Sequence, residues 1–225
     1  MLKKSFLGAA LGAALLAVSS AAHAATVTAY YSLNGGPLTQ VVDLVGAPDV
    51  LVGTFSIGGF TTNIGNSQVA PASSTLMFTN VSSTHAEGSP SETLTVYFLS
   101  TGNNPGGSQT FTSGFTQNFG GTSGSLATFI GNSSLAPPTF AGANPLSSTP
   151  YAGLLSTSFL ASVIAPSDFS LLAVYNVTAQ GSAGSNATIN ISAVPGPIVG
   201  AGLPGLIMAC GGLLALARRR RREAV

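Results

Sequence analysis

The chain has very little charge, and its few charges are unevenly placed. Only 6% of its 225 residues are Asp, Glu, Lys or Arg, and none of the seven Lys and Arg lies between residues 5 and 217. The stretch between those limits is acidic. Its carboxylates are Asp43, Asp49, Glu87, Glu92 and Asp168. Because nucleic-acid binding depends on Lys and Arg that neutralise phosphates, we expect no nucleic-acid partner.

Cysteine and histidine, which supply many nucleophiles, bases and metal ligands, are nearly absent. The chain has one Cys and two His. Cys210 lies in an apolar C-terminal segment and His23 near the N-terminus, so the body of the chain has no disulfide and retains only His85. Without a His/Cys cluster the sequence offers no zinc-type site. Asp43 and Asp49 could give calcium two ligands, but the EF-hand spacing is absent.

Two catalytic arrangements can be drawn from what remains, and neither has a supporting motif. His85 with Asp168 and a serine would make a triad, but no G-x-S-x-G nucleophile elbow is present. Glu87 and Glu92 are the carboxylates nearest to one another, and a glycosidase needs such a pair. A histidine in a loop at the end of a strand is the simpler interpretation of His85. We therefore predict no enzyme, no catalytic residue, no cofactor and no metal.

The N-terminal residues 1–24 have the three parts of a secretory signal peptide. Two lysines precede an apolar run, which ends at the small-residue site Ala22-His23-Ala24. The apolar run is shorter than the roughly 20 residues that a membrane span requires. We therefore expect cleavage after Ala24, so that the exported chain begins at Ala25.

The C-terminal residues 194–225 have the composition of a membrane span with a cytoplasmic stop. Residues 198–217 carry no charge and, as a helix, would match the roughly 30 Å of a bilayer's hydrocarbon core. An arginine cluster follows, and the positive-inside rule keeps it in the cytoplasm. Its members are Arg218, Arg219, Arg220, Arg221 and Arg222. The sequence alone leaves a plain, uncut single-span anchor as an alternative to a processed tail.

This tail resembles the PEP-CTERM sorting domain in its VPGP variant. The motif is Val194, Pro195, Gly196 and Pro197, followed at once by the apolar segment and the arginines. Gly196 stands where the commoner form has Glu. The resemblance implies an exosortase partner, transient residence in the inner membrane, cleavage near the motif and delivery to the cell surface or an exopolysaccharide matrix.

Residues 25–193 read as one all-β domain. Apolar and polar residues alternate along short runs separated by Gly- and Pro-rich turns, which is typical of an antiparallel β-sandwich. The clearest runs are 26–33, 75–81, 92–100, 168–180 and 186–193. We expect the last two to form a hairpin. Residues 152–165 are the one candidate for a short helix, and 131–151, with its prolines, reads as a long loop and the first choice for a binding surface.

The remaining surface is rich in Ser, Thr, Asn and Gly and almost uncharged. It offers many hydroxyl and amide partners of the kind a carbohydrate matrix presents, and its strands lack the Lys residues that usually protect sheet edges. We therefore predict an exported, non-enzymatic surface or exopolysaccharide-matrix protein. The alternative is a carbohydrate-binding module or adhesin that uses loops such as 131–151.

Overall fold

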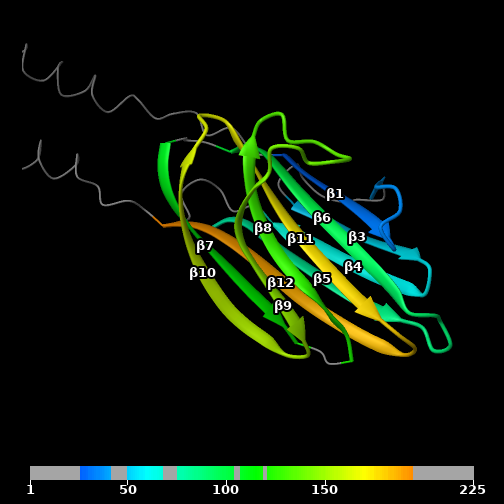
Figure 1. Cartoon of the computed structure of the whole chain (residues 1–225). Helices are drawn as coiled ribbons and strands as arrows, with labels where there is room; N and C mark the ends of the chain where they lie inside the picture. Colours follow the sequence, from blue (N-terminus) through cyan, green and yellow to red (C-terminus); the bar gives the residue numbers. More distant parts are fainter. Residues whose placement is uncertain (1–25, 42–49, 68–74, 104–106, 119–120, 195–225) are drawn as a thin grey trace, which may run out of the picture.

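Two six-stranded antiparallel sheets pack face to face in the computed structural model (Figure 1). The structure describes residues 26–41, 50–67, 75–103, 107–118 and 121–194. Sheet I has the order β2-β1-β6-β11-β8-β9. Its strands are β1 (Thr26–Leu33), β2 (Thr39–Gln40), β6 (Glu92–Asn103), β8 (Ser123–Asn132), β9 (Asn144–Ala152) and β11 (Phe169–Ala179).

Sheet II has the order β10-β7-β12-β5-β4-β3. Its strands are β3 (Val50–Ile57), β4 (Phe60–Ser67), β5 (Thr75–His85), β7 (Gly107–Gln117), β10 (Leu155–Ala165) and β12 (Ala183–Val194). The two sheets and their antiparallel pairing confirm the all-β sandwich that the alternating pattern predicts.

The last eight strands follow the order of a jelly roll. The chain crosses between the sheets so that β6-β11-β8-β9 faces β5-β12-β7-β10 (Figure 1). Strands β1 and β2 extend sheet I beside β6, and β3 and β4 extend sheet II beside β5. As a result, the connections β5–β6, β7–β8, β9–β10 and β11–β12 meet at the same end of the sandwich.

Two sequence-based expectations about local structure are wrong, and the one candidate for a short helix is a strand. The runs 168–180 and 186–193 do not form a hairpin, because β11 belongs to sheet I and β12 to sheet II. Residues 155–165 form strand β10 rather than a helix, since their side chains alternate between the core and solvent. The long loop is shorter than expected, because residues 144–152 pair with β8 as strand β9.

The core between the sheets is aromatic and continuous. Every second residue of the central strands points into it, as the period-two pattern requires. Its largest fully buried rings are Phe60, Phe98, Phe111, Phe115, Phe169 and Tyr175. Inward-facing polar residues bond across the core: the hydroxyls of Ser113 (β7) and Thr128 (β8) lie 2.7 Å apart.

A second apolar cluster lies on the outer face of sheet I. Residues 133–143, between β8 and β9, fold over this face and bury Leu135 and Phe140 against Leu99 and Leu172. Tyr97, Tyr30, Phe129 and Val174 pack around the same cluster. We call this half of the outer face the covered half. Leu135, Phe140 and Ala143, which are apolar residues of the expected loop, are therefore part of this cluster.

The sorting and processing residues fall almost wholly outside the described residues. That holds for Ala22, Ala24, Ala25, Pro195, Gly196, Pro197, the apolar segment 198–217 and Arg218–Arg222. Val194 is the last residue of β12, and 41% of its side-chain surface is exposed. Within the part of the chain that the structure describes, no helix is long and apolar enough to cross a membrane.

Candidate functional site

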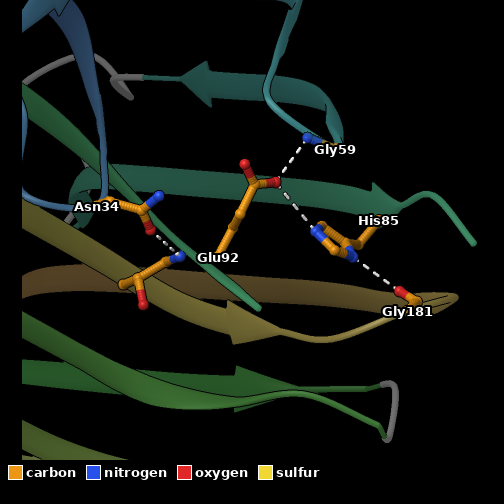
Figure 2. A network of polar contacts seen from close by, with 6 residues as sticks. Asn34, Gly59, His85, Glu92 and Gly181 are labelled. Atoms are coloured by element: carbon orange, nitrogen blue, oxygen red, sulfur yellow. Dashed lines mark hydrogen bonds and ion pairs between the residues drawn. The ribbon is translucent and has the colours of Figure 1, made fainter. Parts of the chain in front are cut away.

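His85 lies at the end of β5, as expected, but it is buried in a polar network rather than placed in a loop. Its Nδ1 donates to the Gly181 carbonyl at 2.7 Å, and its Nε2 lies 3.2 Å from Oε2 of Glu92 (Figure 2). The Gly59 amide donates to the same carboxylate oxygen at 2.6 Å. Both ring nitrogens are engaged, so neither is left to activate a serine.

This network ties two turns to the ends of β5 and β6. Gly59 belongs to the β3–β4 turn and Gly181 to the β11–β12 turn, so the His85–Glu92 pair holds both in place (Figure 2). The neighbouring Gly58 has φ +55°, and a Cβ there would lie 2.5 Å from Oε1 of Glu92. Only glycine fits that close approach. We therefore assign the pair a positioning role in the loops at this end of the sandwich.

The other carboxylates do not assemble into a site. Glu87 and Asp168 are solvent-exposed, and the His85 nitrogens contact neither of them. Asp43 and Asp49 lie outside the described residues. Among the residues that the structure does describe, no group of three or more His, Cys, Asp or Glu could hold a metal ion.

A pocket of about 390 Å³ opens where the four connections meet, next to the network. The β5–β6 connection contributes Ser91, the β7–β8 connection Thr122, the β9–β10 turn Gly153 and the β11–β12 turn Gln180. The rest of its lining is Gly121, Ser123, Ala152, Thr178 and Ala179. We call it the end pocket. Its lining carries hydroxyl, amide and backbone groups but no ionisable side chain.

Thr122 is the most informative residue of the end pocket. It is only 7% exposed, and its Oγ1 is buried without a hydrogen-bond partner among the described residues. A buried hydroxyl left unpaired costs roughly 1–3 kcal/mol, so an unpaired group in a native structure calls for an explanation. Asn66 and Ser170 also have buried unpartnered atoms, but they do not line the pocket. Thr122 lines the end pocket, but its hydroxyl oxygen is itself buried, so a ligand would reach that oxygen only after a small shift of the pocket wall.

Two lining residues of the pocket, Ser123 and Thr178, are paired on β8 and β11 and lie at the edge of the uncovered half of the outer face of sheet I. There the register sets Thr95, Asn176 and Ser125 side by side on β6, β11 and β8. Asn176 donates to the Thr95 hydroxyl at 2.9 Å, and the Thr93 and Thr178 hydroxyls are also 2.9 Å apart. We call this surface the polar half. It presents a row of hydroxyl and amide groups that leads into the end pocket.

The site can hydrogen-bond a neutral, polyhydroxylated molecule. It has no Arg or Lys to hold a phosphate or carboxylate, because residues 5–217 contain none. The nearest carboxylate belongs to Glu92, whose side chain is only 11% exposed and faces inward to His85 and Gly59. The chemistry of the lining therefore suits uncharged hydroxyl groups rather than ions.

The end pocket does not include the stretch that the sequence indicates as the first choice for a binding surface. That stretch, residues 131–151, instead contains the segment that packs over the covered half and most of strand β9. The residues of the end pocket come from four turns far apart in sequence, and only the jelly-roll crossing brings them together. The Gly-rich turns were visible in the sequence, but nothing in their composition indicates which of them meet.

Comparison with known proteins assigns no family. No family model and no curated protein sequence matches the chain. The Lys-gingipain adhesin domain K3 of Porphyromonas gingivalis is similar in structure, with 13% identity over 51% of this chain and 74% of that one, at a TM-score of 0.36.

Two carbohydrate-binding proteins give similar values. A structure described as showing promiscuous specificity of carbohydrate-binding modules from the β-sandwich superfamily has 11% identity over 76% of this chain and 86% of that one, at a TM-score of 0.35. The structure of TmCBM61 in complex with β-1,4-galactotriose has 13% identity over 61% of this chain and 88% of that one, at a TM-score of 0.30. At TM-scores this low, the similarities do not indicate what this chain binds, and the candidate site is supported by its own geometry alone.

Proposed function

We propose that the chain is an exported, non-catalytic domain that binds a neutral carbohydrate in the end pocket and along the polar half. The observation that carries this proposal is the lining of the end pocket, which combines hydroxyl, amide and backbone groups with no ionisable side chain. The Thr122 hydroxyl, unpartnered among the described residues, is buried in its wall. Sugars present several hydroxyls, each of which donates and accepts, as the Thr and Ser hydroxyls and the Gln180 amide of the lining do.

The shape of the site favours a chain-like ligand. The end pocket is open to the polar half, where Ser125, Thr95 and Asn176 extend the same hydroxyl and amide surface across three strands. One sugar ring would occupy the pocket, and the following units would lie along the strands. Binding would need little rearrangement, since the His85–Glu92 pair already fixes the β11–β12 turn beside Gln180.

A conservative substitution of Thr122 tests the proposal. Thr122→Val keeps the shape and removes the hydroxyl that has no partner in the unliganded protein. We expect unchanged or slightly higher stability, since an unpaired buried polar group is lost, and roughly 2- to 12-fold weaker glycan binding for one lost hydrogen bond. The full-length chain would be measured on an array of neutral and anionic oligosaccharides, followed by calorimetry.

Two further variants complete the design. Thr112→Val, on the outer face of sheet II, is the matched control and should bind like the wild type. Ala152→Trp fills the pocket mouth and should abolish binding. The proposal fails if the wild type binds no neutral glycan, if it binds anionic glycans alone, or if Ala152→Trp binds as the wild type does.

We also propose that the tail delivers the domain to the surface, on the strength of the sequence of residues 194–225. An exosortase would cut near Val194–Pro197 and release the chain from the inner membrane toward an exopolysaccharide. Intact mass of the protein from extracellular and membrane fractions tests this. An extracellular product from Ala25 to near the motif is expected, whereas a species found only in membranes with Arg218–Arg222 still attached would contradict it.

A further inference from the structure

The four edge strands of the sandwich are not equally protected. In sheet I, β2 has two residues and β9 carries Pro145 and Pro150, and both features discourage pairing with another chain. In sheet II, β3 is 8 residues long and includes Gly53. Strand β10 is the exception, because its 11 residues contain no proline, glycine or charge. Among the described residues, it pairs with β7 alone.

Exposed apolar side chains gather on and beside the same strand. Leu160 is 72% exposed, Ile164 85%, and Leu154, just before the strand, 78%. Phe159, which tilts against Phe115 in the core at a ring distance of 5.9 Å, is still 38% exposed. These four residues make up more than half of the large hydrophobic side chains that are exposed in the described part of the chain. We call strand β10 with these side chains the β10 edge.

The β10 edge is complementary to a second copy of itself. In an antiparallel pair with its two-fold axis at Leu160, all 11 residues from Leu155 to Ala165 find a partner. This register sets the half-exposed ring of Phe159 opposite the small side chain of Ala161, twice, and Leu160 opposite Leu160. Shifting the axis by two residues in either direction leaves part of the strand unpaired.

The absence of charge on β10 also favours a second copy of the chain as its partner. Two identical β10 edges bury no charge when they meet, because neither contains an ionisable residue. A charged partner strand would lose hydration at this edge and find no opposite charge on β10, which has neither acidic nor basic side chains.

We infer that the β10 edge is a self-association surface, through which two copies of this chain join their second sheets into one continuous 12-stranded sheet. The backbone donors and acceptors along the outer side of β10 then pair with those of the second copy. This inference is independent of the end pocket.

Cysteine cross-linking tests the register. In the background Cys210→Ser, Leu160→Cys places the two thiols opposite each other at the axis. Directly opposite residues in antiparallel strands have Cα atoms about 4.5–5.5 Å apart, which a disulfide spans. We expect a covalent dimer under mild oxidation. Ser156→Cys is the matched control, because its two copies lie about 26 Å apart along the strands and should not cross-link.

A charge on the edge tests the association itself. The full-length chain, purified in detergent, should change from monomer to dimer with increasing concentration in analytical ultracentrifugation. Leu160→Lys should weaken the dimer at least 10-fold and keep the circular dichroism spectrum of the fold. Val52→Lys, a residue 54% exposed on the opposite edge strand β3, should leave association unchanged.

Hydrogen exchange separates edge pairing from stacking of faces, since only edge pairing protects alternate backbone amides of β10 in the dimer. The inference is overturned if the wild type stays monomeric up to about 1 mM. It is equally overturned if Leu160→Lys and Val52→Lys weaken association alike, or if Ser156→Cys cross-links as readily as Leu160→Cys.

Discussion

The strands of both sheets follow the same alternating pattern, but the outer face of sheet I is partly covered by another segment, whereas that of sheet II is open to solvent. On sheet II the outward positions of β4, β5 and β12 are mainly Thr, Asn and Ser, and they meet solvent directly. On sheet I the covered half holds Leu99, Leu172 and Tyr97, which need the cover made by residues 133–143. Strand periodicity alone therefore does not show whether the outer face of a sheet is open to solvent or covered by another segment.

The comparison is sharpest in one aromatic residue on each face. Phe140 is 7% exposed on the covered half, whereas Phe78 on the outer face of sheet II is 40% exposed. Phe140 adopts φ +47°, a conformation uncommon for a residue with a side chain. Its ring stacks on Tyr97 at 5.2 Å and meets Tyr30 edge-on at 6.3 Å. The packing of the ring offsets the cost of this backbone conformation.

The largest expected effect is the loss of this cover. Phe140→Ala should lower the free energy of unfolding by about 3–5 kcal/mol, because it leaves a cavity over Leu99 and Leu172. Urea denaturation followed by far-UV circular dichroism measures it. Phe78→Ala is the matched control and should cost about 1 kcal/mol or less. Equal losses for the two variants would mean that residues 133–143 do not act as a cover.

Tyr97 reports on the same cover through its titration. Burial raises the pKa of Tyr97 above its ordinary value of about 10, and a hydrogen bond with Thr95 opposes that rise. The folded state therefore keeps the phenol proton at a pH where the unfolded state loses it, so this contribution to stability declines as pH rises above about 10. In Phe140→Ala, the pKa of Tyr97 should fall toward its ordinary value in an ultraviolet titration.

The smallest expected effect lies on the exposed side of sheet II. Asn63→Ala removes the 2.6 Å hydrogen bond from the Thr54 hydroxyl to the Asn63 side chain, and both residues are solvent-exposed. Water replaces the lost partner, so the free energy of unfolding should change by no more than about 0.5 kcal/mol. The same urea titration measures it. A loss near that of Phe140→Ala would break the distinction between a covered and an open face.

The sequence predicts the strands well and their partners poorly. Alternation in 26–33 and 92–100 identifies strands β1 and β6, because period two is a local property of the chain. The placement of β11 in sheet I and β12 in sheet II cannot be derived from local sequence. A three-residue connection such as 180–182 can either form a hairpin within one sheet or cross to the other sheet. Residues 152–165 leave a short helix open as a candidate, because the outward-facing Leu160 and Ile164 of β10 blur the alternation.

The candidate site depends still more on topology. Thr122 and Gln180 are ordinary turn residues in the sequence, and only the jelly-roll crossing sets them in one pocket. His85 with Glu92 is similar: the two are close in sequence, but their shared role depends on Gly59 and Gly181, which come from distant turns. The scarcity of charge is evident from the sequence, and the lining of the end pocket agrees with it because it has no ionisable side chain.

The position of β12 has a mechanical consequence. The strand lies between β5 and β7, and it ends at Val194, where the proposed sorting motif begins. A pull on a chain held by this end would run along β12 and across two antiparallel ladders at once. Their hydrogen bonds lie perpendicular to that force and share it in shear, rather than opening one by one. The domain is thus built to resist being torn from its C-terminal side.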